Sequence, residues 1–166
     1  ACKFENDQVD SRFDFYSLGN NFRNTDINAL IGLLDLNKWP KYVKKRRKLY
    51  GIFKKLLNKD RYILPDDSCS PDSSWFTPFC IPIICKNGTS EKRIWSIKRY
   101  CTDNSIETRP IISGFLGYQT AFKEYFGNEK DYPNSIYLHN NGIYIGLNMK
   151  VKEKDIIKLT EFLNKI

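Results

Sequence analysis

The sequence predicts an α+β domain in which a small mixed or antiparallel sheet is covered by helices. Two observations support this fold class. The 166 residues suit one domain of ordinary size with enough chain for a hydrophobic core. Along the chain, segments with helical and strand-like hydrophobic patterns follow one another in the order α-α-β-α-β-α-β-α, without an internal repeat. Such elements bury their apolar sides by packing helices against a sheet.

The helices are recognised by apolar residues at three- and four-residue steps, which share one face of a helix. In the first helix, residues 25–36, this stripe is Ile27, Leu30, Ile31 and Leu34. In the second, residues 40–58, it is Val43, Tyr50, Phe53 and Leu57, and Pro40 suits a first turn. Further helices are predicted at 90–104 and 152–166, with a shorter aromatic-rich helix through Ala121, Phe122, Tyr125 and Phe126 and a single turn at 133–138.

Three segments rich in aromatic and β-branched residues predict strands at 75–85, 106–112 and 142–147. Pro78 and Pro82 push the first of them toward a sheet edge or a bulge, because proline cannot donate a ladder hydrogen bond. Residues 64–74 hold two prolines, three aspartates and four serines, a composition typical of a surface loop.

The positive charge of the chain is concentrated in one helix. The formal net charge is +8, and the segment Lys41 to Lys59 contains nine Lys and Arg residues and no acid. Such a cluster is either an ordinary solvated helix face or a binding surface for nucleic acid or another polyanion. The amphipathic pattern of the segment favours the solvated face.

Cysteine and histidine usage argues against a metal site. The five cysteines have no two-residue spacing, and His139 is the only histidine, so no zinc ligand set is recognisable. An odd cysteine count without a leader sequence indicates reduced thiols, and we therefore expect a cytoplasmic protein. No apolar run approaches the roughly 20 residues that cross a bilayer, so no membrane association is expected.

A polar turn at residues 16–24 leads into the first helix. Thr25 can cap this helix with its hydroxyl, and Asp26 occupies the first turn, where the helix dipole favours a negative charge. Asn21 and Arg23 remain to point outward. The turn is either a meeting point for an anion or the entry loop of a capped helix.

Two blocks of residues carry a resemblance to a known family. The first block comprises Gly19, Asn21, Phe22, Arg23, Thr25, Asp26, Ile27, Ala29, Ile31, Gly32, Leu33, Leu36, Arg46 and Arg47. The second comprises residues 106–114, Gln119, residues 132–135 and residues 139–146. The blocks resemble the aminotransferase and dehydratase family typified by DegT and StrS, and the second is similar to the subgroup that acts on nucleotide-linked 4-keto-6-deoxysugars. Asn20, Asn24, Leu30, Phe115 and residues 117–120 depart from the family pattern.

The resemblance implies the C-terminal small domain of a fold type I enzyme dependent on pyridoxal 5'-phosphate. Residues 1–15 would then be a lead-in from a large domain, and residues 16–166, including the basic helix 40–58, the small domain. The large domain, with its catalytic lysine or histidine, is not recognisable in this sequence, so no catalytic residue is assigned in this chain. Whether the chemistry is transamination or 3-dehydration depends on that missing residue.

The resemblance implies a role for Asn21, and side-chain chemistry suggests roles for three more residues. Asn21 would reach across a homodimer to the cofactor phosphate of the neighbouring subunit, the alternative being a plain loop amide. Arg23 would be a phosphate or carboxylate clamp or an internal ion pair. Arg109 would face the diphosphate of the nucleotide-linked keto-sugar or form a structural salt bridge. His139 would contact substrate, although a packing role is favoured.

The function predicted from sequence is therefore the C-terminal part of a nucleotide-sugar aminotransferase or 3-dehydratase in surface polysaccharide (lipopolysaccharide or O-antigen) synthesis. Two alternatives stay open. One is a stand-alone module that binds a polyanion or nucleic acid through Lys41 to Lys59, and the other is a degenerate remnant that only dimerises.

Overall fold

The structure is a computed structural model that describes residues 24–65, 77–86, 91–118 and 125–166. The chain divides into two units, residues 1–38 and residues 39–166, which are described separately. The predicted lead-in at residues 1–15 and the predicted boundary at residue 16 lie outside the described residues and stay predictions. In the part of the chain that the structure describes, no helix is both long and apolar enough to span a membrane.

In the first unit, helix α1 (Asp26–Leu36) forms as predicted. The Thr25 hydroxyl caps it by accepting a hydrogen bond from the Asn28 N–H at 3.3 Å, and Asp26 lies in the first turn. The apolar stripe of this helix is not buried as expected, and α1 has no buried residue. Its large apolar side chains are 55–72% exposed, and these are Ile27, Leu30, Ile31, Leu33, Leu34 and Leu36.

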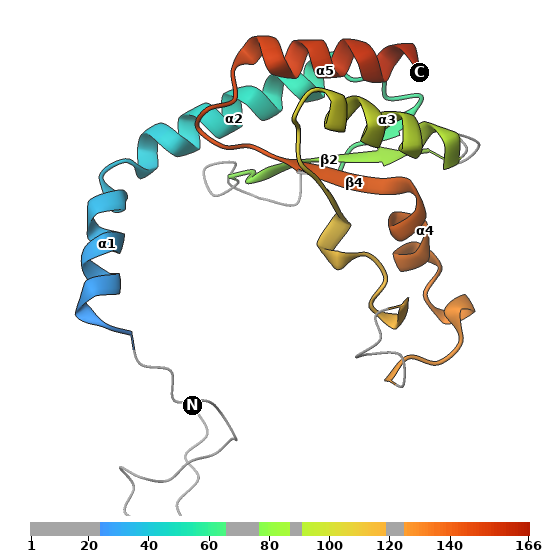
Figure 1. The fold of residues 1–166 in the computed structure, drawn as a ribbon, viewed down its shortest axis with the longest axis horizontal. Coiled ribbons are helices and arrows are strands. Elements are labelled where there is room, and N and C mark those ends of the chain that lie inside the picture. The colour runs from blue at the N-terminus through green and yellow to red at the C-terminus, as the bar shows by residue number, and fades with distance from the viewer. Residues whose placement is uncertain (1–23, 66–76, 87–90, 119–124) are drawn as a thin grey trace, which may run out of the picture. The chain divides into compact units, whose positions relative to one another are not determined.

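The second unit is built on a four-stranded sheet with the strand order β1-β2-β4-β3, in which every pair is antiparallel. The strands are β1 (Tyr62–Ile63), β2 (Cys80–Cys85), β3 (Thr108–Pro110) and β4 (Gly142–Gly146). β4 therefore lies between two strands that precede it in the chain. The predicted α+β class with a small sheet is confirmed (Figure 1).

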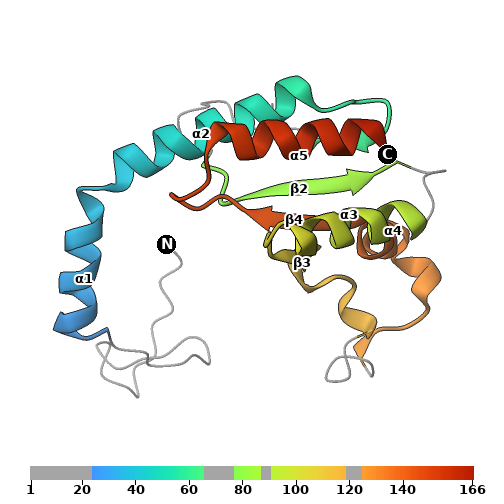
Figure 2. The ribbon, with the colours of Figure 1, turned by 45° about the horizontal axis from the view of Figure 1, so that its top comes forward.

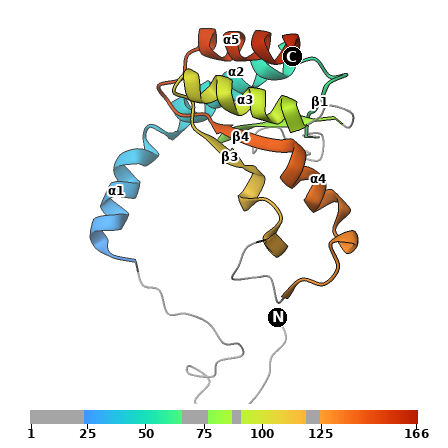
Figure 3. The same cartoon turned by 45° about the vertical axis from the view of Figure 1, so that its right-hand side comes forward.

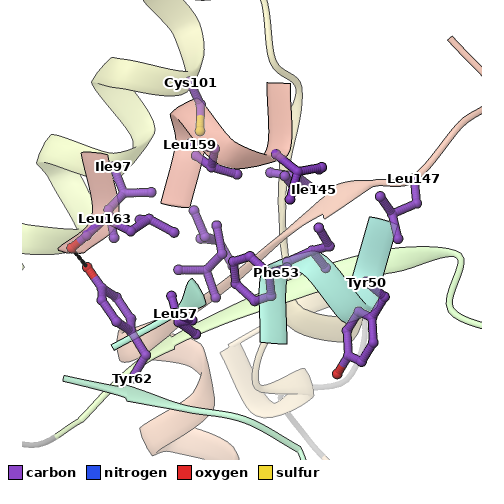
Figure 4. Packing of buried hydrophobic residues seen from close by; sticks show 14 of the residues in the cluster. Tyr50, Phe53, Leu57, Tyr62, Ile97, Cys101, Ile145, Leu147, Leu159 and Leu163 are labelled. Atoms are coloured by element: carbon purple, nitrogen blue, oxygen red, sulfur yellow. Dashed lines mark hydrogen bonds between the residues drawn. The ribbon is translucent and has the colours of Figure 1, made fainter. Parts of the chain in front are cut away.

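Three helices bring apolar side chains to one face of the sheet. They are α2 (Trp39–Leu56), α3 (Glu91–Asp103) and α5 (Glu153–Lys165), and α2 and α5 run side by side above the strands (Figure 2). Phe53, Ile97 and Leu163 are fully buried against Ile83 of β2 and Ile143 of β4. Figure 4 shows buried side chains of these helices packed together in the core. The Tyr62 hydroxyl donates to the Leu163 carbonyl there at 2.8 Å.

The opposite face of the sheet carries helix α4 (Pro133–Asn141), below one end of the strands (Figure 3). The Tyr137 hydroxyl holds it there by donating to the Cys85 carbonyl at 2.6 Å. Only one helical turn is predicted here from the sequence, so the helix is longer than expected. Because α4 covers one end only, the other end of this face is left for the candidate site.

Several predicted strand limits are wrong. Within the described residues, the first predicted strand begins at Cys80 and not before, and the predicted strand 106–112 shortens to β3. Pro110 ends β3, and Ile112 takes a positive φ of 44°, a conformation that no strand contains. The short strand β1 is not predicted at all. The expectation that Pro82 places its strand at a sheet edge or a bulge is wrong for the strand as a whole, because β2 lies between β1 and β4. At Pro82 itself β2 pairs with β4 alone, since β1 pairs only with Ile84 and Cys85.

The predicted aromatic-rich helix falls partly at residues 119–124, outside the described residues, and Phe126–Asn128 are not helical. The other predicted helices are confirmed in α2, α3 and α5, and their expected stripes are buried at Tyr50, Phe53 and Leu57 and at Ile156, Leu159 and Leu163.

The basic helix α2 is not a uniformly solvated surface. Arg46 is half-buried and donates through Nε to the Leu147 carbonyl at 3.1 Å, and Lys45 donates to the Met149 carbonyl at 2.5 Å. Lys48 pairs with Glu153 of α5 at 2.6 Å. Three of the basic side chains thus connect α2 to residues 147–149 and to the first turn of α5.

Candidate functional site

A row of side chains crosses the end of the sheet that α4 does not cover. Pro82 of β2 pairs with Tyr144 of β4, which pairs in turn with Arg109 of β3. Because residues directly opposite each other share a face, and because Ile143 and Ile145 on either side of Tyr144 point into the core, this row lies on the face away from α2 and α5. The sheet register therefore brings a phenol and a guanidinium together on an accessible surface.

A pocket of about 540 Å³ lies over this row. Its walls come from the start of β2, from the turn between α3 and β3, and from the segment that follows β4. Its lining residues are Phe79, Ser105, Ile106, Glu107, Arg109, Tyr144, Gly146, Asn148 and Val151. Phe79 and Tyr144 meet edge to face with ring centroids 6.0 Å apart. The pocket thus combines aromatic surface with one cation.

Arg109 is the cation of this pocket, and it is paired with Glu107. The Arg109 Nε donates to the Glu107 Oε1 at 2.9 Å, and 63% of the arginine side chain is exposed. The hydrogen bond and charge of Glu107, followed by Tyr144, raise the pKa of Arg109 above its ordinary value. A guanidinium carries five N–H donors in a planar fork, and the bond to Glu107 uses Nε. Tyr144 also forms a side-chain hydrogen bond with Arg109. Arg109 lines the pocket, and the donors of its fork beyond these two bonds suit a phosphate or carboxylate.

His139 lies elsewhere, on α4. Its Nδ1 accepts a hydrogen bond from the Phe115 backbone N–H at 3.1 Å, and its ring meets Tyr118 edge to face at 5.0 Å. Gly114, with a φ of 74°, passes so close that an added Cβ would lie 2.3 Å from the His139 Nδ1. An accepting Nδ1 leaves the proton of the neutral ring on Nε2. The described contacts of His139 are thus those of a packed, backbone-fixed ring.

The structure does not bring all four predicted site residues together. Arg109 lines the pocket and His139 does not. Asn21 and Arg23 lie outside the described residues, so their predicted roles stay predictions. Sequence reasoning missed Phe79, Glu107 and Tyr144 as pocket residues. The sequence held a signal for Glu107 and Tyr144. Glu107 is two residues from Arg109 and so shares its strand face, and Tyr144 lies within residues 139–146 of the second block.

The family of the chain is established by comparison with known proteins. Residues 2–164 match the DegT/DnrJ/EryC1/StrS aminotransferase family, and the chain belongs to this family. It is 27% identical over 161 residues to the GDP-4-keto-6-deoxy-D-mannose 3-dehydratase of Yersinia pseudotuberculosis, covering 96% of this chain and 40% of the relative. It is also 27% identical over 164 residues to the lipopolysaccharide biosynthesis protein RfbH of Salmonella typhimurium, covering 92% of this chain and 36% of that protein.

A solved structure gives the same family relationship. The Escherichia coli GDP-4-keto-6-deoxy-D-mannose-3-dehydratase with bound hydrated pyridoxal phosphate superposes with a TM-score of 0.69 at 26% identity, over 96% of this chain and 40% of that chain. The predicted fold, the small domain of a fold type I enzyme, is thereby confirmed. The chain spans about two-fifths of the length of these relatives.

Proposed function

We propose that this chain is the small domain of a pyridoxal-phosphate-dependent enzyme that acts on a nucleotide-linked 4-keto-6-deoxysugar, by transamination or 3-dehydration, in the synthesis of surface polysaccharide. The observation that carries this proposal is the alignment of 96% of the chain with a GDP-4-keto-6-deoxy-D-mannose 3-dehydratase. The relationship to a lipopolysaccharide biosynthesis protein supports the polysaccharide pathway. Because the chain spans only part of these relatives, the activity belongs to the complete enzyme.

Within that enzyme, the pocket over β3 and β4 holds the nucleotide-linked substrate. Arg109 donates to a phosphate oxygen of the diphosphate, since it lines the pocket and its charge is secure. Phe79 and Tyr144 offer ring faces and edges to the flat or apolar parts of the ligand. The contribution of this chain is to bind and orient the substrate.

The described residues suit substrate better than cofactor. The described residues that line the pocket include no lysine, and the one arginine among them is balanced by Glu107. Asn21, which the family resemblance assigns to the cofactor phosphate in trans, and Arg23, a second candidate, lie outside the described residues. When bound, pyridoxal phosphate supplies an electron sink, while protein groups position the reactants. A contribution of Asn21 in trans requires a homodimer, and we place this dimeric enzyme in the cytoplasm.

The rival function, polyanion binding by Lys41 to Lys59, is not favoured by the contacts of α2. Lys45, Arg46 and Lys48 are engaged with the backbone near residues 147–149 or with Glu153. If α2 were a nucleic-acid site, the chain would bind DNA or RNA more weakly as salt is added. The logarithm of the binding constant would then fall linearly with the logarithm of the salt concentration, as counterion release requires. A salt titration separates the two functions.

The proposal is tested by titrating the full chain with GDP-mannose, a stable nucleotide-linked hexose, and following backbone amide shifts by NMR. We expect Arg109→Gln to lower the affinity about tenfold, since one hydrogen bond to a charged group typically contributes about 1.5–3 kcal/mol and about 1.4 kcal/mol is a factor of ten. The matched control is Arg99→Gln, which removes an exposed arginine of α3 paired with Asp103. Equal affinities of parent and Arg109→Gln would overturn the assignment of this pocket.

A further inference from the structure

The pairing of Arg109 with Glu107 places a negative charge inside the pocket that is expected to receive an anion. Both residues line the pocket, their side chains share one face of the chain at β3, and both remain solvent-accessible, the carboxylate side chain at 74%. An ion pair this exposed contributes little to stability. A carboxylate next to the one cation of an anion pocket therefore calls for a different explanation.

The charge balance of the pocket supplies one. Among the described lining residues, the titratable side chains are Glu107, Arg109 and Tyr144. With Glu107 ionised and Tyr144 neutral, the lining carries no net charge. An anion that reaches the guanidinium of Arg109 is therefore attracted by one group and repelled by its neighbour 2.9 Å away. Each additional negative charge on the ligand is attracted by Arg109 and repelled by Glu107, so the carboxylate reduces what that charge contributes to binding.

We propose that Glu107 is a specificity-determining residue that selects the internal diphosphate of a nucleotide-linked sugar against a terminal phosphate. In a sugar-linked diphosphate, each phosphate has one ester bond and one anhydride bond and carries one negative charge. In a free nucleoside diphosphate, the terminal phosphate is substituted only through the anhydride bond, so it has a second ionisation near pH 6, as a phosphate monoester does, and approaches two charges above that pH. Glu107 thereby favours the substrate over the nucleotide that remains when the sugar is lost.

This inference rests on the proposed function and deepens it by naming the chemical class of phosphate. Its expected size follows from Coulomb attraction and repulsion in an exposed site. One extra charge about 5 Å from a carboxylate in a water-like medium changes the affinity by about fourfold. The effect is modest but is measured as a ratio between two ligands, which cancels general losses.

The experiment measures the Kd of GDP-mannose and of GDP for the full chain and for Glu107→Gln, by the same NMR titration. The control is Glu161→Gln, which neutralises an exposed carboxylate of α5 outside the pocket. The titrations are run at about pH 8 and at about pH 5.5, on either side of the second phosphate ionisation near 6.

We expect Glu107→Gln to lower the ratio of the GDP Kd to the GDP-mannose Kd about fourfold at the higher pH, as the Coulomb estimate requires. At the lower pH the two ligands should differ less in the parent chain, because the terminal phosphate of GDP has gained a proton. Glu161→Gln should keep the parent ratio. A merely structural role of Glu107 would weaken both ligands equally, leave the ratio unchanged at both pH values and overturn the inference.

The outcomes separate this inference from the proposed function. If Arg109→Gln weakens GDP-mannose binding while Glu107→Gln keeps the parent ratio, only the role of Glu107 is wrong. If GDP-mannose causes no shift changes up to about 10 mM, well above the roughly millimolar Kd that a few polar contacts provide, both the pocket assignment and the inference are wrong.

Discussion

Helices α1 and α5 are similar in length and in having a capped N-terminus, but they differ in burial. They are 11 and 13 residues long, and each has a satisfied first turn, from the Thr25 hydroxyl in α1 and from the Asp155 carboxylate, which accepts from the Lys152 N–H at 2.9 Å, in α5. Yet α5 buries Ile156, Leu159, Thr160 and Leu163, whereas α1 buries no residue within its unit. Caps and periodicity define where a helix forms, but they do not supply the surface that covers it.

The difference also shows how each helix would be stabilised. A helix of this length is marginal by itself in water, and tertiary packing usually provides most of its stability. α5 has this packing in the described structure, and its carbonyl at Leu163 also receives the Tyr62 hydroxyl. The described polar contacts of α1 are short in sequence, from Thr25 to Asn28 and from Asp35 to Lys38.

The largest effect is expected when the same substitution, Leu→Ala, is compared in both helices. Leu159→Ala should lower the free energy of unfolding by about 2–5 kcal/mol, because it opens a cavity at a residue that is 1% exposed. Leu30→Ala removes a side chain that is 58% exposed and should change it by less than about 0.5 kcal/mol. Urea unfolding of the full chain measures both. Comparable losses would show that α1 is covered in solution, and the contrast would then disappear.

A smaller effect is expected where a basic side chain ties α2 to the segment ahead of α5. Arg46→Gln removes the Nε donor to the Leu147 carbonyl and should cost about 1–2 kcal/mol, near the lower end for a charged hydrogen bond because the site is half-exposed. Lys44→Gln removes the same charge from an exposed position of α2 and should be nearly neutral. Equal urea midpoints for the two variants would mean that Arg46 belongs to the solvated face after all.

The smallest effect at neutral pH involves the phenol that anchors α5. Burial, and then the nearby Cys85, raise the pKa of Tyr62 from 10.0 to about 12. The neutral phenol is therefore favoured in the folded chain, and its contribution is complete below pH 10 and is lost as the pH rises toward 12. Tyr62→Phe should cost about 1 kcal/mol at pH 7 through the lost bond to Leu163.

The gap in stability between the parent and Tyr62→Phe should then narrow between pH 10 and 12, because in this interval the phenol ionises freely only in the unfolded parent chain and stabilises that state, whereas the Phe variant has no such group. Urea unfolding at a series of pH values follows this gap directly. A gap that stays constant over the interval would show that Tyr62 ionises as easily in the folded chain as in the unfolded one.

Much of the fold follows from local pattern. The stripes at Tyr50, Phe53 and Leu57 and at Ile156, Leu159 and Leu163 are long enough to reveal both helix and buried face. The strands are harder to delimit, because the ends of β3 depend on Pro110 and on the positive φ of Ile112. β1 has only two residues, and it exists because Tyr62 and Ile63 pair with Cys85 and Ile84, a long-range contact that no local period records.

The sequence predicted the arginine of the candidate site but not the other residues that line the pocket. The family resemblance pointed to Arg109, and the structure places this arginine in the pocket over β3 and β4. Its neighbours Tyr144 and Phe79 arrive through sheet register and through the segment before β2, which the sequence alone does not align. The burial of Arg46 was missed because a carbonyl from the distant residue Leu147 receives it.

The position of β4 between β2 and β3 has a consequence for synthesis on the ribosome. β2 and β3 emerge first, but each pairs with β4 and not with the other. The four-stranded sheet therefore cannot assemble until residues 142–146 have left the exit tunnel, and until then Ile81 and Ile83 of β2 lack their pairing strand, because the short β1 pairs only with Ile84 and Cys85. Unpaired apolar strands of this kind promote aggregation. Chaperone demand during translation should consequently peak before β4 appears and fall once it docks.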